Sequence, residues 1–202
     1  MRSNRCEGYQ NLQRREFIAA MASTFGAALP LSAHQAEPFV LPDDFLPTIV
    51  DTVAQMPVGV IHVFPDQFRL YLTLPDQKAL RYTIGVGRPG LYHAGEFTVG
   101  AKREWPSWTP TPAMIERDPD AYAEFADGMP GGVDNPLGAR ALYLHDPQGV
   151  DSYLRIHGTN LPRTIGTAVS NGCARLTNDH ITDLFDRVPV GTRVYLYPQA
   201  AV

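Results

Sequence analysis

The chain has 202 residues, of which 44% are hydrophobic and 19% charged, with 18 prolines and 17 glycines. This composition is typical of one soluble globular domain with short strands and frequent turns, and it argues against a helical bundle. The formal net charge is −4. Setting residues 1–36 aside leaves 13 basic and 19 acidic residues, so no basic surface favours nucleic acid as a partner.

Residues 1–36 have the pattern of an export signal. Four arginines precede a mild apolar run, residues 17–31, that is too short and too weakly apolar to span a bilayer. The adjacent Arg14 and Arg15 resemble a twin-arginine signal, which predicts export to the periplasm. Cleavage after Ala33 or Ala36, an uncleaved tether and an amphipathic N-terminal helix stay open as alternatives.

Removal of the signal would also remove Cys6 and leave Cys173 as the single cysteine. In an oxidising compartment, an odd cysteine has no intramolecular disulfide partner. Cys173 is therefore buried and inert, paired with another chain, or a reactive thiol.

The first half of the remaining chain indicates strands after a proline-rich leader, residues 37–57. Apolar and β-branched residues predict strands at 60–64, 68–74, 79–87 and 96–104, the first two joined by a turn at Pro65 and Asp66. Residues 104–138 are irregular and offer no room for a long helix. Trp105 and Trp108 in this segment either cover the cleft as a lid or simply pack.

The second half continues with a hairpin, a helix and a closing strand. The hairpin pairs residues 141–145 with 153–157, and alternation places Tyr153, Arg155 and His157 on one face of the second strand. Apolar residues at helical spacing predict a helix over 177–188, capped by Thr177 or Asn178, before a last strand at 191–197. The prediction is a mainly β domain with one helix packed on it.

Cys173 and His157 are the residues with the clearest chemistry. An imidazole that accepts the thiol proton turns cysteine into a nucleophile, and the backbone N–H groups of the SNGC turn, residues 170–173, suit a developing oxyanion. Gly172 permits a close approach of the backbone, and Arg175 favours the thiolate. From the residues alone, a buried structural cysteine and a metal site of Cys173, His157 and His145 stay open. His145, His62 and His93 are weaker candidates for function.

The segment from His157 to Leu176 resembles the L,D-transpeptidase catalytic domain, the YkuD family, in its ErfK/YbiS-like branch. The motif is His157-Gly158-Thr159-Asn160 followed by Ser170-Asn171-Gly172-Cys173-Ala174-Arg175-Leu176. The stretches VFPDQFRLYLTL, YTIGVGRPG, WPSWTPTPAMI, DNPLGARALYL and LFDRVPVGTRVYLY extend the likeness over residues 58–198 in the same order. The resemblance implies a YkuD-like β-sandwich with one short helix after Cys173 and a long irregular segment over the cleft.

The resemblance further implies a cysteine enzyme that works on peptidoglycan stem peptides without a cofactor or metal. Cys173 would attack the third residue of a tetrapeptide and release D-Ala, His157 would carry the proton, and the N–H groups of Gly172 and Cys173 would hold the oxyanion. Ser170 would support the turn and the imidazole, and the carbonyl of Gly158 would orient His157. Arg175 would bind a substrate carboxylate or, alternatively, pair with Asp179. The remaining expected substrate contacts are Asn171, Thr159, Asn160 and Gly158.

The implied acceptor is an amine of another stem peptide, giving a 3-3 cross-link, or a lysine of an outer-membrane lipoprotein. Carbapenem-type inhibitors would acylate the same thiol. Two alternatives stay open: an enzyme of the same family in which water resolves the thioester, and a wall-binding module without catalysis. Departures from the family pattern at Asn171 and at residues 93–96 bear on substrate preference.

Overall fold

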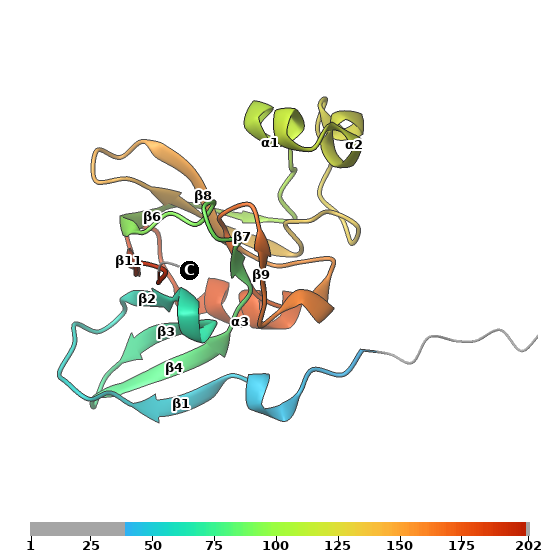
Figure 1. Ribbon diagram of the computed structural model, residues 1–202. Helices are drawn as coiled ribbons and strands as arrows, with labels where there is room; N and C mark the ends of the chain where they lie inside the picture. The colour runs from blue at the N-terminus through green and yellow to red at the C-terminus, as the bar shows by residue number, and fades with distance from the viewer. Residues whose placement is uncertain (1–38, 201–202) are drawn as a thin grey trace, which may run out of the picture. The chain divides into compact units, whose positions relative to one another are not determined.

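The computed structural model describes residues 39–200 (Figure 1). The expectations for residues 1–36, including the twin-arginine pair and Cys6, lie outside the described part. No helix within residues 39–200 is both long and apolar enough to cross a bilayer.

The fold is mainly β and is built on a nine-stranded mixed sheet. Its strand order is β1-β4-β3-β2-β11-β6-β7-β8-β10, and β5 and β9 form a separate two-stranded parallel sheet. The strands are β1 Thr48–Asp51, β2 Ile61–Phe64, β3 Arg69–Leu74, β4 Lys78–Thr83, β5 Val86–Gly87, β6 Gly95–Glu104, β7 Arg140–His145, β8 Asp151–His157, β9 Ala168–Ser170, β10 Ala174–Arg175 and β11 Arg193–Leu196.

Both predicted hairpins are present. β2 and β3 pair in antiparallel fashion around a 3-10 turn, Pro65–Gln67, where the turn was expected. β7 and β8 also pair in antiparallel fashion, but their register shifts between Tyr143 and His145. The last strand, β11, joins the two halves of the sheet, because it lies between β2, to which it is parallel, and β6, to which it is antiparallel.

The predicted helix after Cys173 is α3, Asn178–Arg187. Thr177 rather than Asn178 caps it, with its hydroxyl accepting from the His180 N–H. The apolar face of α3 is buried in the same cluster as the inner faces of β2, β3, β4, β6, β7, β8 and β11. One hydrophobic core therefore holds the sheet and the helix that follows the cysteine together.

Residues 104–138 differ from the expectation of an irregular segment. They contain α1, Pro112–Arg117, then α2, Pro119–Tyr122, and a 3-10 turn, Ala123–Phe125. Figure 1 shows α1 and α2 together outside the strands. The prediction of a single helix is therefore wrong, because two short capped helices begin at prolines of this segment.

The described part of the proline-rich leader, residues 39–57, is also more ordered than predicted. It contains a 3-10 turn, Asp43–Phe45, and then β1, which pairs in antiparallel register with β4. The side chains of β1 are mostly exposed, so this edge strand is held by its backbone ladder rather than by the core.

Candidate active site

The pairing of β8 with β10 brings the His157 and Cys173 segments together. The two strands are parallel, with Ile156 opposite Ala174 and His157 opposite Arg175. Cys173 directly precedes β10 and is thus one position from this ladder. Because strands lie about 4.8 Å apart and rise about 3.3 Å per residue, this register puts the Cα atoms of His157 and Cys173 roughly 8 Å apart.

The two reactive side chains share one face of the strand pair. Ile156 and Ala174 point into the core, with 0% and 4% of their surface exposed. Side chains alternate along a strand, so His157 and Arg175 point to the opposite face, as does Cys173 on the extended chain before β10. The predicted grouping of imidazole, thiol and guanidinium is what this topology produces.

His157 is buried and held in one tautomer. Its Nδ1 lies 2.6 Å from the carbonyl oxygen of Gly158, so Nδ1 carries the hydrogen and Nε2 the lone pair. Burial and, next, the charge of Arg175 lower the pKa of His157 to about 3, although the carbonyls of Gly158 and Leu137 oppose the change. A neutral imidazole with a free Nε2 is a proton acceptor at neutral pH.

Cys173 is a free, half-buried thiol. Burial raises its pKa above the ordinary value, whereas the backbone N–H of Arg155 and the charges of Arg155 and Arg175 act in the opposite direction. The expectation that Arg175 favours the thiolate is right in sign, but burial outweighs it. Thiol and imidazole are therefore both neutral at rest, and within residues 39–200 the thiol makes no hydrogen bond to His157.

The turn before Cys173 is held by Ser170 and shaped by Gly172. The Ser170 hydroxyl donates to the Cys173 carbonyl at 2.7 Å and accepts from the Gly172 N–H at 3.3 Å. Gly172 has φ +123°, and a Cβ there would lie 2.7 Å from the Leu91 carbonyl oxygen and face the chain rather than a substrate. Of the two predicted oxyanion donors, the Gly172 N–H is thus already engaged, which leaves the Cys173 N–H.

Arg175 is a buried cation that forms no ion pair within the described residues. Only 9% of the residue is exposed, and its Nε and Nη2 atoms are buried without a hydrogen-bond acceptor. The four ion pairs found within residues 39–200 do not include it, so the alternative pairing with Asp179 is absent from the structure. A buried charge without a counter-ion is unfavourable, and an anionic ligand next to Cys173 and His157 would relieve it.

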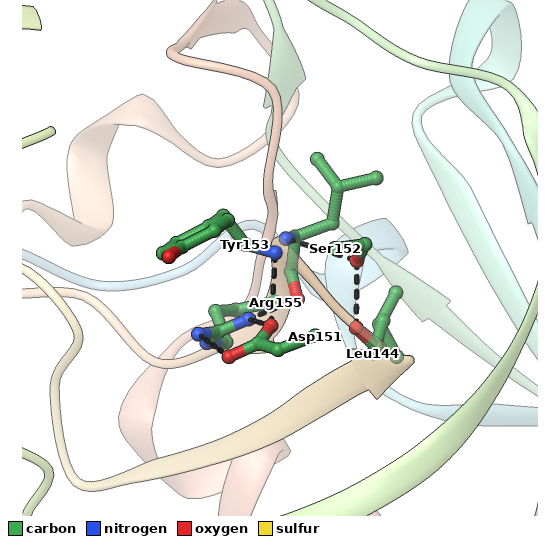
Figure 2. A network of polar contacts seen from close by, with 6 residues as sticks. Leu144, Asp151, Ser152, Tyr153 and Arg155 are labelled. Carbon is green, nitrogen blue, oxygen red and sulfur yellow. Dashed lines mark hydrogen bonds and ion pairs between the residues drawn. The ribbon is translucent and has the colours of Figure 1, made fainter. Parts of the chain in front are cut away.

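A polar network braces β8 (Figure 2). Asp151 accepts two bonds from the Arg155 guanidinium, at 2.6 and 2.8 Å, and one from the Tyr153 N–H at 2.9 Å. Ser152 donates to the Leu144 carbonyl at 2.6 Å. The network stabilises a strand in which Tyr153 has φ +61°, and it fixes the Arg155 N–H that favours the thiolate.

Three of the expected substrate contacts, Gly158, Thr159 and Asn160, make hydrogen bonds that hold the His157 loop. Thr159 is buried, and its N–H donates to Asn178 Oδ1 at 3.2 Å. Asn160 donates to the Asp134 carbonyl at 2.8 Å, and the Gly158 N–H donates to the Arg140 carbonyl at 3.0 Å. These residues lock the loop that carries the Gly158 carbonyl, so they bear on the orientation of His157.

The side chain of Asn171 makes three hydrogen bonds to protein groups. Its Oδ1 accepts from Arg88 at 3.1 Å and from Arg117 at 2.7 Å, and its Nδ2 donates to the Tyr122 hydroxyl at 2.9 Å. Sequence reasoning singled out Asn171 but missed the other three residues. No local pattern could have found them, because they come from three separate segments.

Two of the weaker candidates, His145 and His62, lie outside this grouping. His145 contacts the backbone of Gly100, and His62 stacks on Tyr195 and Tyr197. No cluster of three or more His, Cys, Asp or Glu residues suited to a metal occurs in the described residues.

The two tryptophans differ in their surroundings. Trp108 packs against Tyr122 and Phe125 with ring centroids 6.2 and 5.9 Å apart, in favour of the packing interpretation. Trp105 is partly exposed and has φ +41°.

Comparisons with known proteins agree on the family. The profile of the YkuD family, described as an L,D-transpeptidase catalytic domain, matches residues 59–196. The probable L,D-transpeptidase ErfK/SrfK of Escherichia coli K12 is 37% identical over 177 residues, which cover 85% of this chain and 51% of that protein. The chain thus spans about half the length of this curated relative.

Two solved structures have the same fold. A crystal structure from Brucella melitensis, named a probable carnitine operon oxidoreductase, is 46% identical with a TM-score of 0.53, covering 81% of this chain and 96% of that one. L,D-transpeptidase 3 of Mycobacterium tuberculosis, in complex with a faropenem-derived adduct, is 16% identical with a TM-score of 0.51, covering 75% and 61%. Because these names differ in activity, the chemistry has to be argued from the residues of the site.

Proposed function

Since the chain belongs to the YkuD family of L,D-transpeptidase catalytic domains, which are cysteine-dependent enzymes, we propose that it transfers acyl groups between peptidoglycan stem peptides with Cys173 as nucleophile. The donor is a tetrapeptide stem, and the carbonyl attacked is that of its third residue, a diamino acid.

One observation carries the proposal. Among the described residues, Nε and Nη2 of the buried Arg175 guanidinium have no hydrogen-bond partner, and Arg175 lies opposite His157, two residues after Cys173. A peptide that ends in a carboxylate supplies the missing anion next to the thiol and the imidazole. This arrangement favours a donor with a free C-terminal D-Ala.

In the first half-reaction, the S–H proton of Cys173 passes to Nε2 of His157 while sulfur bonds to the carbonyl carbon. The Cys173 N–H donates to the oxyanion. The tetrahedral species collapses, the C–N bond to D-Ala breaks, and the imidazolium returns its proton to the leaving amine. The product is a thioester on Cys173.

In the second half-reaction, an acceptor amine attacks the thioester. Its proton passes to His157 and then to the leaving sulfur, which restores the thiol. A second stem peptide gives a 3-3 cross-link, a lipoprotein lysine gives an attached protein, and water gives a tripeptide.

Purified tetrapeptide muropeptides test the proposal. The protein should release D-Ala and form dimers, detected by mass, and Cys173→Ala should release none. Tripeptides without dimers would establish the hydrolytic variant. Absence of D-Ala release from folded protein would contradict both.

Acylation of the thiol distinguishes the proposed enzyme from a wall-binding module without catalysis. Faropenem should add its mass to the wild-type protein and not to Cys173→Ala. A folded protein that takes up neither a β-lactam nor a thiol reagent would favour the binding module.

We further propose that residues 1–36 direct export to the periplasm. A fusion of this segment to a reporter should be exported, and replacement of Arg14 and Arg15 by lysine should block export. Export that survives this replacement would indicate a different route.

A further inference from the structure

Two arginines converge on the turn that precedes Cys173. Arg88 directly follows β5, and its backbone N–H donates to the Ser170 carbonyl at 3.0 Å, which anchors it to the turn. Arg117 ends α1. The Nη2 atoms of both side chains donate to one atom, Oδ1 of Asn171, at 3.1 and 2.7 Å.

This cluster lacks an anion. Because both Nη2 atoms bind one oxygen, they lie no more than about 6 Å apart, and the oxygen between them is neutral. The ion pairs within the described residues include neither arginine. Arg88 and Arg117 are exposed, so both are accessible to a ligand. Two unpaired cations meet here on a chain whose net charge is −4.

The amide oxygen of Asn171 has the position that a carboxylate oxygen takes between two guanidinium groups. A carboxylate there accepts the same N–H groups and also neutralises the charge, which makes each bond stronger. The structure therefore already contains the donor geometry of a carboxylate site, filled by a neutral group.

We propose that Arg88 and Arg117 bind a second carboxylate of the peptide substrate, distinct from the terminal carboxylate at Arg175. This inference rests on the proposed function. Asn171 precedes Cys173 by two residues, so their Cα atoms are at most about 7 Å apart. A carboxylate bound there lies within about one to three residues of the carbonyl that Cys173 attacks. The pair thus selects an acidic residue next to the cleavage site.

A purely structural role makes different predictions. As a latch, the Arg88, Arg117 and Asn171 contacts would hold α1 and α2 against the turn, because Asn171 also binds Tyr122 of α2. Loss of the latch would weaken the fold and the binding of every peptide equally. Loss of a carboxylate site changes only the preference for an acid over its amide.

The experiment compares two tetrapeptides that differ only in one internal carboxylate, free or amidated. Their affinities are measured by calorimetry in the Cys173→Ala background, so that the result does not depend on turnover. The parent protein should bind the acid at least tenfold more tightly. This ratio should fall to near one in the double variant Arg88→Gln, Arg117→Gln.

Two further variants sharpen the test. Asn171→Asp places a carboxylate between the arginines, so it should abolish the preference while urea unfolding shows a fold at least as stable. Arg193→Gln removes an exposed arginine of β11 and should leave the preference unchanged.

Equal binding of the acid and the amide by the parent protein would overturn the proposal, and so would a preference that survives in the double variant. D-Ala release by the wild-type protein is scored separately. Turnover without acid preference refutes the second carboxylate site alone, and preference without turnover refutes the catalytic assignment alone.

Discussion

Replacement of His157 by asparagine should reduce the loss of folding stability at acidic pH, because this loss arises from the burial of His157. Burial lowers the pKa of His157 to about 3 in the folded protein, whereas an unfolded histidine takes up its proton near 6.5. Below pH 6.5 the unfolded chain therefore binds a proton that the folded protein excludes, and stability falls as the pH falls. At about 1.4 kcal/mol per pH unit, the loss between pH 6.5 and pH 5 is about 2 kcal/mol.

Urea unfolding at pH 7 and pH 5 measures this loss within each protein, so a general change in stability caused by the substitution cancels. The wild-type protein should lose about 2 kcal/mol more than His157→Asn. His62 and His180, whose pKa values burial also lowers, are present in both proteins and cancel. His93→Asn, which removes an exposed histidine, should behave as the wild type. Equal losses in wild type and His157→Asn would refute the reasoning.

Three further predictions concern β10 and the turn that precedes it. Arg175→Met should leave the unfolding free energy unchanged or raise it, because it removes an unpaired buried charge, while KM for tetrapeptides rises at least tenfold; strong destabilisation in urea would instead reveal a hidden partner. Gly172→Ala should lower the unfolding free energy by at least about 2 kcal/mol, because the methyl group meets the Leu91 carbonyl at a positive φ, and an unchanged urea midpoint would contradict this. The rate of Cys173 alkylation by iodoacetamide should rise with pH, with a midpoint above the ordinary pKa of a thiol, because burial raises the pKa of Cys173. A midpoint below the ordinary pKa would show that the charges of Arg155 and Arg175 outweigh burial.

Sequence patterns located the strands whose side chains enter the core. Alternation in β3 and β8 and helical spacing in α3 report burial, and these elements lie where they were expected. β1, β9 and β10 were not predicted, because two to four residues carry too little pattern and depend on pairing with a neighbouring strand.

The helices α1 and α2 were missed although their start signals are in the sequence. Thr111 caps α1 and Asp118 caps α2, each followed by a proline at the first helical position. In this segment the prolines begin helices rather than end them.

In the candidate site, too, contacts that are local in the chain were predicted and contacts between distant segments were not. The Gly158 carbonyl beside His157 was expected from the family motif and is present, because the contact is local in the chain. Two other features depend on the exact path of the turn. The Gly172 N–H donates to the Ser170 hydroxyl, and Arg88 and Arg117 both donate to Asn171. Such contacts arise from tertiary structure and leave no trace in residue spacing.

The close approach of two glycines has a consequence for engineering. A Cβ on Gly87 would lie 2.8 Å from the Cα of Gly172, so the main chain at the end of β5 packs directly against the main chain before the thiol. A graft that places a side chain at either position therefore displaces the facing segment. Such a graft must change residues 85–92 and 170–173 together.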